Sequence, residues 1–304
     1  MKNRILSAYH DTPTLWKNLL TQGLTDDGWP WDWTSLGIHS WQGRPGPKVH
    51  AQITAKAGGV WAAEGLVSAL PLVAKELGGT IAVSRAKGAL KNGQIFTPGT
   101  VVCEWKGGAR EILALERPFL NLASYTSGIA TQTRRLVEIV TKACPKRTPR
   151  VTATRKTLPG YRDLAIHGVL AGGGHSHRVS LSGGVLIKEN HIASAGGIGN
   201  AITSVRALAP HLLKIEIEVR TLAELKQALR YQADVVMLDN FNPAQIRAAL
   251  KIINAAETRP VLEVSGGLNE SNIAEFAIEG VDILSIGSLT HSVRAVDLSL
   301  LIVK

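Results

Sequence analysis

Short apolar segments recur at regular intervals through the second half of the chain. They lie at 151–154, 185–187, 213–219, 235–238, 261–264 and 283–286. Amphipathic segments separate several of them, so the pattern predicts alternating strands and helices, with parallel strands and right-handed connections. We expect a barrel rather than an open sheet, because no Gly-x-Gly-x-x-Gly turn follows the first strand.

Start and stop signals mark three of the intervening helices. Thr221 and Glu224 have the spacing of a capping box before an apolar run. Asn242 offers an N-cap followed by proline at the first helical position. We expect a third helix to begin at Asn269 and to end at Gly280.

The first third of the chain differs in composition from the rest. All seven tryptophans lie between Trp16 and Trp105, which suggests a domain boundary near Arg117. Before that boundary the pattern predicts mixed α and β structure, and after it a long helix. The expected strands lie around 81–84, 100–106 and 111–116, and the helix covers 120–143 with a possible break at 127–128.

Composition and charge narrow the class of protein. The formal net charge is +10, but the basic residues are scattered and lack interleaved aromatic residues, so we expect a small anionic substrate or a basic surface rather than a nucleic-acid partner. Two cysteines in 304 residues predict a reducing, cytoplasmic setting. The start of the chain lacks the apolar segment of a signal peptide, and no stretch approaches the roughly 18 to 20 apolar residues of a membrane helix.

Polar residues or glycine turns follow all six predicted strands. The groups are Arg155 and Lys156, Lys188, Glu218, Asp239, Ser265 with Gly266 and Gly267, and Gly287. Active sites of α/β barrels gather at the carboxyl ends of the strands. A polar residue at one strand end would be weak evidence of an active site, whereas polar residues or glycine turns at all six strand ends predict one.

The basic residues at these positions differ in the kind of anion that they bind best. Arg155 and Arg178 can each direct two hydrogen bonds at a planar carboxylate, which lysine cannot do. Lys156 and Lys188 are compact charges suited to phosphate oxygens. For Arg117 considered alone, a surface ion pair is the simpler interpretation.

The strand at 213–219 carries acids on one face. Lys214, Glu216 and Glu218 alternate with apolar residues and would point into the barrel, where acids need a partner. For Glu216 we prefer an internal ion pair with Lys214. Glu218 and Asp239 together could hold Mg²⁺.

Glycine turns and two histidines complete the candidate chemistry. Gly266, Gly267 and Gly287 would let backbone amides approach a phosphate closely. His175 and His177 have a spacing that suggests zinc, but no third ligand is evident, so His177 is better interpreted as a donor to the substrate.

Seven segments, taken in order, resemble the quinolinate phosphoribosyltransferase family. They are Thr-Arg-Lys-Thr-Leu-Pro-Gly at 154–160, Gly-Gly-Gly-His-Ser-His-Arg at 172–178, Leu-Ile-Lys-Glu-Asn-His-Ile at 186–192, Glu-Ile-Glu-Val at 216–219, Met-Leu-Asp-Asn-Phe at 237–241, Leu-Glu-Val-Ser-Gly-Gly at 262–267 and Ile-Gly-Ser-Leu-Thr-His-Ser at 286–292. The resemblance covers the chain from about residue 112 onward. Before that it rests on 31–35 and 59–65 only.

The resemblance implies a two-domain enzyme of NAD biosynthesis. An N-terminal α/β sandwich over 1–118, to which 292–304 return, would join an incomplete parallel α/β barrel over 119–291. The enzyme would transfer phosphoribosyl from phosphoribosyl pyrophosphate to quinolinate with loss of CO₂. Family members are homodimers in which the other subunit closes each active site.

The resemblance also assigns roles by position. Quinolinate would contact Arg117 from across the dimer interface, Thr154, Arg155, His177, Arg178 and Lys188. Phosphoribosyl pyrophosphate and Mg²⁺ would contact Lys156, Glu218, Asp239, Ser265, Gly266, Gly267, Gly287 and His291. Among these, the catalytic residues would be Lys156, Lys188, Glu218 and Asp239.

The chain departs from the family pattern at Ala153, where aspartate is common, and at Gly183 and Gly184, which replace an acidic residue. Two other interpretations stay open. One is a transferase of the same fold that acts on nicotinate or another base. The other is a basic nucleotide-binding protein with a disabled site, which a steep salt dependence of binding to DNA would support.

Overall fold

The chain folds into two compact units, seen in a computed structural model that describes residues 10–40, 46–84 and 90–303. The first unit comprises the chain up to residue 134 together with 163–173 and 293 onward, and the second comprises 135–162 and 174–292. The boundary expected at 118 lies inside helix α5 (Ala109–Ala143). In the described part of the chain, no helix has both the length and the apolar character needed to cross a membrane.

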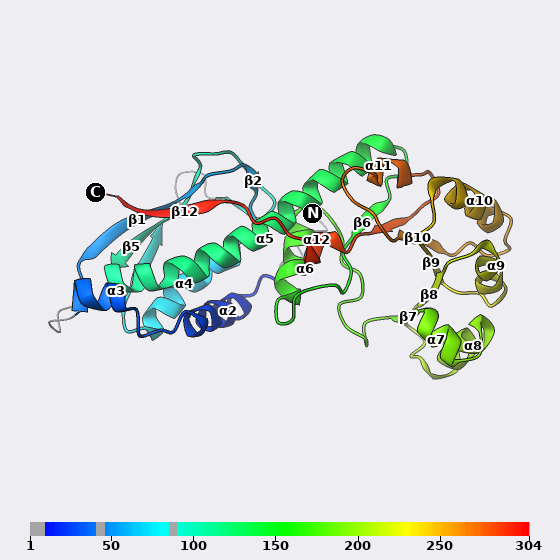
Figure 1. The fold of residues 1–304 in the computed structure, drawn as a ribbon, viewed down its shortest axis with the longest axis horizontal. Helices are drawn as coiled ribbons and strands as arrows, with labels where there is room; N and C mark the ends of the chain where they lie inside the picture. The colour runs from blue at the N-terminus through cyan, green and yellow to red at the C-terminus, as the bar shows by residue number, and fades with distance from the viewer. Residues whose placement is uncertain (1–9, 41–45, 85–89, 304) are drawn as a thin grey trace. The chain divides into compact units, whose positions relative to one another are not determined.

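An antiparallel sheet forms the centre of the first unit (Figure 1). Its strand order is β12 (Leu298–Val303), β1 (Lys48–Ala55), β5 (Val101–Gly108) and β3 (Ile81–Ser84). The last strand of the chain therefore pairs with the first, from His50 opposite Val303 to Ala55 opposite Leu298. The short strands β2 (Gly59–Val60) and β4 (Ile95–Phe96) form a separate pair. The remaining elements are α2 (Pro13–Asp26), α3 (Trp33–Ser35), the π-helical segment η1 (Leu36–Ser40), α4 (Glu64–Glu76) and α6 (Arg162–Ala171).

Tryptophans build much of the core of the first unit. Trp16, Trp61 and Trp105 are at most 1% exposed, and the ring of Trp105 meets that of Phe119 edge to face at 4.8 Å between centroids. Each such ring buries a large apolar area, which explains these three tryptophans, whereas Trp31 and Trp33 are exposed. Trp41 lies outside the described residues.

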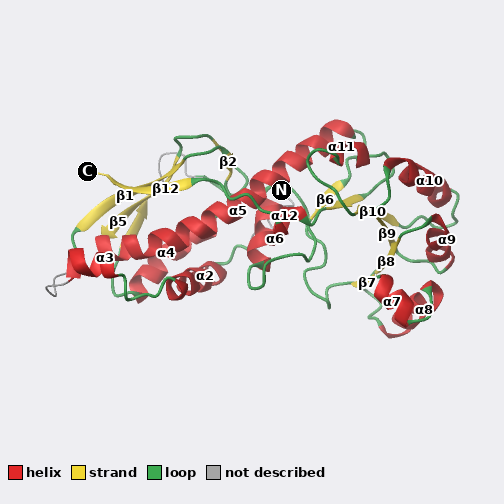
Figure 2. Cartoon of the chain, in the orientation of Figure 1, coloured by secondary structure: helices red, strands yellow, loops and turns green. Residues whose placement is uncertain are grey.

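Helix α5 replaces one strand that the sequence pattern suggested. The expected strand at 111–116 is wrong, because the segment lies in the first turns of α5 (Figure 2). Its alanine, glutamate and leucine favour helix, and Ile112 and Phe119, seven residues apart, are buried on one face. The break considered at 127–128 is absent, since the helix continues through Gly128. A Cβ there would lie 2.4 Å from a backbone oxygen of the C-terminal segment, so this glycine permits close packing.

Six parallel strands form the sheet of the second unit, and each predicted apolar segment overlaps one of them. In sheet order they are β6 (Arg150–Thr152), β11 (Ile283–Ser285), β10 (Val261–Ser265), β9 (Val235–Asp239), β8 (Ile215–Val219) and β7 (Val185–Ile187). The chain order therefore runs around a barrel, but among the described residues β6 and β7 do not pair with each other. The barrel is incomplete, as expected.

Helices pack outside these strands, with α8, α9 and α10 in an arc (Figure 1). The helices of this unit are α7 (Glu189–Ser194), α8 (Ile198–Leu208), α9 (Leu222–Arg230), α10 (Pro243–Asn254), α11 (Ile273–Phe276) and α12 (Ser288–His291). The N-caps of α9 and α10 are confirmed, and the cap of α10 forms the complete box with Gln245. In α9 only the Thr221 half forms, because the Glu224 carboxylate accepts the N–H of Arg220.

The third predicted helix is largely wrong. Helix α11 has a single turn that begins after Asn272 and ends before Gly280. The side chain of Asn269 accepts hydrogen bonds from the backbone N–H and the hydroxyl of Ser271, which closes a turn in place of the first helical residues. Gly280 does adopt a positive φ of 101°, but in the loop beyond the helix.

Candidate active site

A cavity of about 540 Å³ lies in the second unit at the carboxyl ends of the strands. It is lined by Thr154, Arg155, Lys156, His177, Arg178, Leu186, Lys188, Glu218, Met237, Asp239, Asn240, Glu263, Ser265, Gly266, Gly267 and Ser285. Eleven of the fourteen residues singled out from the sequence are in this wall. Arg117, Gly287 and His291 are not among the lining residues.

The pairing register of the strands explains which side chains reach the cavity. Met237 on β9 pairs with Glu218 on β8 and with Glu263 on β10, so these three side chains share one level of the interior face. Asp239 and Ser265 form the next level, nearer the strand ends. A parallel strand shows alternate residues to each face, so the acids at 216 and 218 lie on the same face, as the sequence indicates.

Two arginines present hydrogen-bond donors that the protein does not use. Among the described residues, the buried Nε of Arg155 and that of Arg178 have no hydrogen-bond partner. Nη1 of Arg178 donates to the carbonyl of Gly184 at 2.9 Å. Burial lowers the pKa of Arg178, and the positive charge of Arg155 lowers it further. Two neighbouring cations with unused donors favour a bound anion, because it would satisfy the donors and relieve the repulsion.

Glu218 and Asp239, both in the lining, are each paired with a donor side chain. Nζ of Lys188 donates to Oε2 of Glu218 at 2.5 Å, with Glu218 largely buried. Nδ2 of Asn240 donates to Oδ2 of Asp239 at 2.9 Å, and Nε of Arg220 lies 3.6 Å from the same oxygen. Each carboxylate therefore uses one oxygen in these contacts.

The turn after β9 and the glycine turn after β10 fit against each other. Gly266 has a φ of +98° and Gly267 one of +64°, conformations that residues with a side chain rarely adopt. A Cβ on Gly266 would lie 2.3 Å from Oδ1 of Asn240 and 2.8 Å from its backbone nitrogen. That nitrogen donates to the carbonyl of Ser265 at 2.9 Å, so the position of Asn240 is fixed. Sequence reasoning did not single out Asn240, although its place after Asp239 at a strand end was visible.

Gly287 brings two of the candidate residues together beside the cavity wall. A Cβ at this position would lie 3.0 Å from Nε2 of His291 and 3.1 Å from Cδ of Lys156. The hydroxyl of Thr290 donates to the carbonyl of Lys156 at 2.8 Å. The absence of a side chain on Gly287 therefore allows the lysine and the histidine to lie close to one backbone segment.

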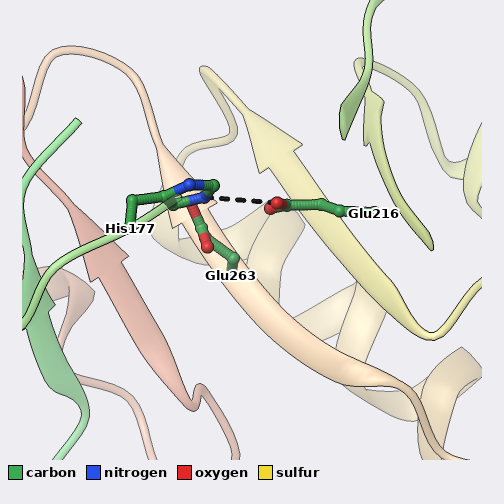
Figure 3. Close-up of side chains that lie close together, drawn as sticks. All are labelled: His177, Glu216 and Glu263. Atoms are coloured by element: carbon green, nitrogen blue, oxygen red, sulfur yellow. Dashed lines mark ion pairs between the residues drawn. The ribbon is translucent and has the colours of Figure 1, made fainter. Parts of the chain in front are cut away.

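Three side chains from separate segments meet beside the cavity, and two of them, His177 and Glu263, line it (Figure 3). Nε2 of His177 lies 3.2 Å from Oε2 of Glu216 and 3.5 Å from Oε1 of Glu263. Oε1 of Glu263 also accepts the hydroxyl of Ser285 at 2.5 Å. The preferred pairing of Glu216 with Lys214 is wrong, because Lys214 precedes β8 and lines a second cavity away from these acids.

His177 and Glu216 in this cluster have shifted pKa values. Burial alone would lower the pKa of His177, but its hydrogen bonds to Glu216 and Glu263 and their negative charges raise it. Burial raises the pKa of Glu216, and the charge of Glu263 adds to this while His177 opposes it. Both shifts favour a proton between Nε2 of His177 and the carboxylate of Glu216.

The same cluster has the composition of a metal site, and its hydrogen bonds argue against one. One ligand atom from each residue lies within 4.8 Å of the others. A histidine that binds a metal usually donates its other ring N–H to an acceptor. Here Nδ1 of His177 instead accepts the backbone N–H of Arg178 at 2.8 Å, so Nε2 carries a proton. His175 lies outside this group.

Sequence reasoning missed Glu263 and Ser285. The segment 261–264 was interpreted as an apolar run, and the acid within it received no role. The available signal was alternation, since Glu263 and Ser265 must share a face of β10. In the structure, Glu263 is 1% exposed and Ser285 is 2% exposed.

Two family models cover most of the chain. The model of the quinolinate phosphoribosyl transferase N-terminal domain matches residues 32–127, and that of its C-terminal domain matches residues 129–301. The chain is similar to a probable carboxylating nicotinate-nucleotide pyrophosphorylase of Methanocaldococcus jannaschii, with 47% identity over 67% of this chain and 72% of that protein.

Two further relatives extend the similarity to nearly the whole chain. A probable enzyme of the same name from Bacillus subtilis is 36% identical over 93% of this chain and 92% of its own length. The solved structure of the nicotinate-nucleotide pyrophosphorylase from Francisella tularensis matches with a TM-score of 0.83 and 32% identity, over 96% of this chain and 97% of that one.

Proposed function

We propose that this chain, which belongs to the quinolinate phosphoribosyl transferase family, converts quinolinate and phosphoribosyl pyrophosphate into nicotinate mononucleotide, CO₂ and pyrophosphate. It is a pentosyltransferase of NAD biosynthesis. The assignments of site residues, metal, dimer and compartment that follow are part of the proposal.

The observation that carries the choice of quinolinate is the pair of unused arginine donors. Quinolinate has two adjacent carboxylates, and Arg155 and Arg178 each offer a buried Nε–H without a protein acceptor among the described residues. Thr154, His177 and Lys188 line the same cavity and complete the pocket. A monocarboxylate such as nicotinate would leave part of this positive charge without a partner, which costs binding free energy.

Phosphoribosyl pyrophosphate would occupy the part of the cavity with Lys156, the glycine turns and the two acids. Gly266 and Gly267 are free of side chains that would hinder a phosphate, and Ser265 adds a hydroxyl. Glu218 and Asp239 fit Mg²⁺, because each uses only one carboxylate oxygen in its hydrogen bonds and Mg²⁺ prefers one or two carboxylates with substrate phosphates and water. Bound there, the ion would supply charge neutralisation of the leaving pyrophosphate.

The residues then act by position and charge. The quinolinate nitrogen forms a bond to C1 of the ribose as the bond from C1 to pyrophosphate breaks, with an oxocarbenium-like transition state. Lys156 would stabilise the phosphates, and Arg155 and Arg178 would hold the pyridine ring in line with C1. The resulting pyridinium charge stabilises the carbanion left at C2 when CO₂ departs, and that carbon then takes a proton.

The site is completed by a second copy of the chain in this proposal. Arg117 does not line the cavity, and a second subunit would supply it across a dimer interface. Gly287 and His291 would contact the phosphates beside Lys156, given their proximity to that side chain. The proposed setting is the cytoplasm.

The test is product formation from quinolinate, phosphoribosyl pyrophosphate and Mg²⁺, with nicotinate in place of quinolinate in a parallel reaction. We expect nicotinate mononucleotide and CO₂ with quinolinate only, and loss of activity when a chelator removes Mg²⁺. Product from nicotinate and none from quinolinate would refute the assignment. Full activity in excess chelator would refute the metal role.

A further inference from the structure

We propose that Glu216 and Glu263 are positioning residues that act through His177 to fix Arg178 in the wall of the cavity. The inference rests on the proposed function, because the cost of losing this arrangement would appear in quinolinate binding. In this proposal His177 orients an arginine. The two buried acids, which take no part in the reaction itself, hold His177 in place.

The acids occupy positions that normally favour apolar side chains. Glu216 is 6% exposed and Glu263 is 1% exposed, and both face the interior of the barrel. Burying a carboxylate costs several kcal/mol unless charge and hydrogen bonds compensate, and an apolar pair would pack at lower cost. Two buried acids in contact with one ring therefore indicate that the orientation of this ring, His177, is important.

The ring of His177 is held at both nitrogens. Nε2 faces the two carboxylates (Figure 3). Nδ1 accepts the backbone N–H of Arg178. A second ring proton at Nδ1 would displace that N–H, so the ring carries its proton at Nε2. The acids thus set both the orientation and the tautomer of the ring.

The orientation of the His177 ring directly affects the position of Arg178. Its backbone is held by His177, and its Nη1 by the carbonyl of Gly184 at 2.9 Å. These two contacts leave Nε, which is buried and without a partner among the described residues, as the donor for a substrate carboxylate. A shift of about 1 Å in such a donor can cost on the order of a hundredfold in rate, so the support of this arginine matters to the site.

Ser285 holds Glu263 in place by a hydrogen bond. Its hydroxyl donates to Oε1 of Glu263 at 2.5 Å, which holds this carboxylate beside the ring. Glu216 has no equivalent support, since its Oε1 has no hydrogen-bond partner among the described residues. His177 is therefore the main compensating group for Glu216, whereas Glu263 is held from two sides.

The first experiment is a double-mutant cycle on Glu263 and His177 with the full-length enzyme. We expect Glu263→Ala and His177→Ala each to raise KM for quinolinate about tenfold and to change KM for phosphoribosyl pyrophosphate less than about threefold. Because the acid acts through the ring, KM for quinolinate in the double variant should be no higher than in the single variant with the higher KM. Additive effects of about a hundredfold, or equal shifts in both KM values, would overturn the proposal.

Conservative variants separate positioning from packing. Glu263→Gln keeps an oxygen acceptor of the same shape, so KM for quinolinate should stay within about threefold of the wild-type value. His177→Asn keeps an acceptor for the N–H of Arg178 and should bind quinolinate more tightly than His177→Ala. The matched control is Glu257→Gln, which removes an exposed acid that lines the second cavity, and should change neither KM.

A spectroscopic measurement tests the arrangement without substrate. Imidazole ¹⁵N shifts of wild-type His177 should show an unprotonated Nδ1 and a protonated Nε2, and Glu263→Ala should shift the ring toward a mixture of tautomers. Protonated Nδ1 in the wild type would refute the proposal. If Glu263→Ala does not fold, Ser285→Ala replaces it in the cycle with a smaller expected effect. An enzyme inactive on quinolinate would refute the proposed function, while the tautomer would still decide the positioning.

Discussion

Adding one methyl group to Gly266 should destabilise the barrel far more than adding it to Gly267. The Cβ of Gly266→Ala would lie 2.3 Å from Oδ1 and 2.8 Å from the backbone nitrogen of Asn240. The side-chain oxygen can rotate away, but the nitrogen is held by its hydrogen bond to the carbonyl of Ser265. Gly267→Ala is the matched control, because nothing lies within 4 Å of its Cβ position.

The expected magnitudes follow from conformation and overlap. A φ of +98° costs a residue with a side chain about 1 to 3 kcal/mol, and overpacking adds about 1 to 3 kcal/mol. The lower entropy of the unfolded alanine variant returns roughly 0.4 to 1 kcal/mol. The net loss for Gly266→Ala is about 2 to 5 kcal/mol, against about 1 kcal/mol for Gly267→Ala, whose φ of +64° lies in the left-handed helical region.

Thermal unfolding by circular dichroism, at equal protein concentrations, measures this difference. At about 2 to 4 °C per kcal/mol for a unit of this size, Gly266→Ala should lower Tm by about 4 to 20 °C and Gly267→Ala by about 2 to 4 °C. Equal shifts in the two variants would refute the reasoning, since both residues sit in the same turn and differ in φ and in their contacts with Asn240.

Three further predictions concern other parts of the chain. Arg155→Ala should raise KM for quinolinate by at least about tenfold, while Arg230→Ala on α9 leaves it unchanged; near-normal steady-state kinetics of the first variant would contradict its role. Burial raises the pKa of the Cys103 thiol to about 12, so this thiol should resist a disulfide reagent at pH 8 until denaturant is added, and rapid reaction in the native enzyme would contradict the burial. Asn242→Ala removes the acceptor for the N–H of Gln245 and should cost about 1 kcal/mol in urea unfolding, with no loss if the cap does not form.

The strand ends were predictable because they depend on local pattern alone. Apolar runs located every strand of the second unit, and the residues that follow them, such as Lys188 and Asp239, line the cavity. Parallel strands bring their carboxyl ends to one edge whatever the details of packing. The site could therefore be assembled from the sequence without knowing any distance.

The partners of buried groups were not predictable in the same way. Glu216 pairs with His177, a residue nearly forty positions away that approaches from a loop, so proximity in sequence to Lys214 was misleading. The segment 111–116 has a short apolar run of the length of a strand, yet it lies in helix α5, one face of which is buried. Both cases depend on tertiary contacts, which override local preference.

The pairing of β12 with β1 has a consequence for synthesis of the chain. The ribosome makes β1 early, and β12 emerges about 240 residues later, which at roughly 5 to 20 residues per second is a delay of about 12 to 50 s. During that interval one edge of β1 has no partner, and an exposed strand edge can pair with another nascent chain. Completion of the first unit therefore waits until β12 has been synthesised, and its exposure to misassembly should depend on elongation rate more than on the stability of the finished fold.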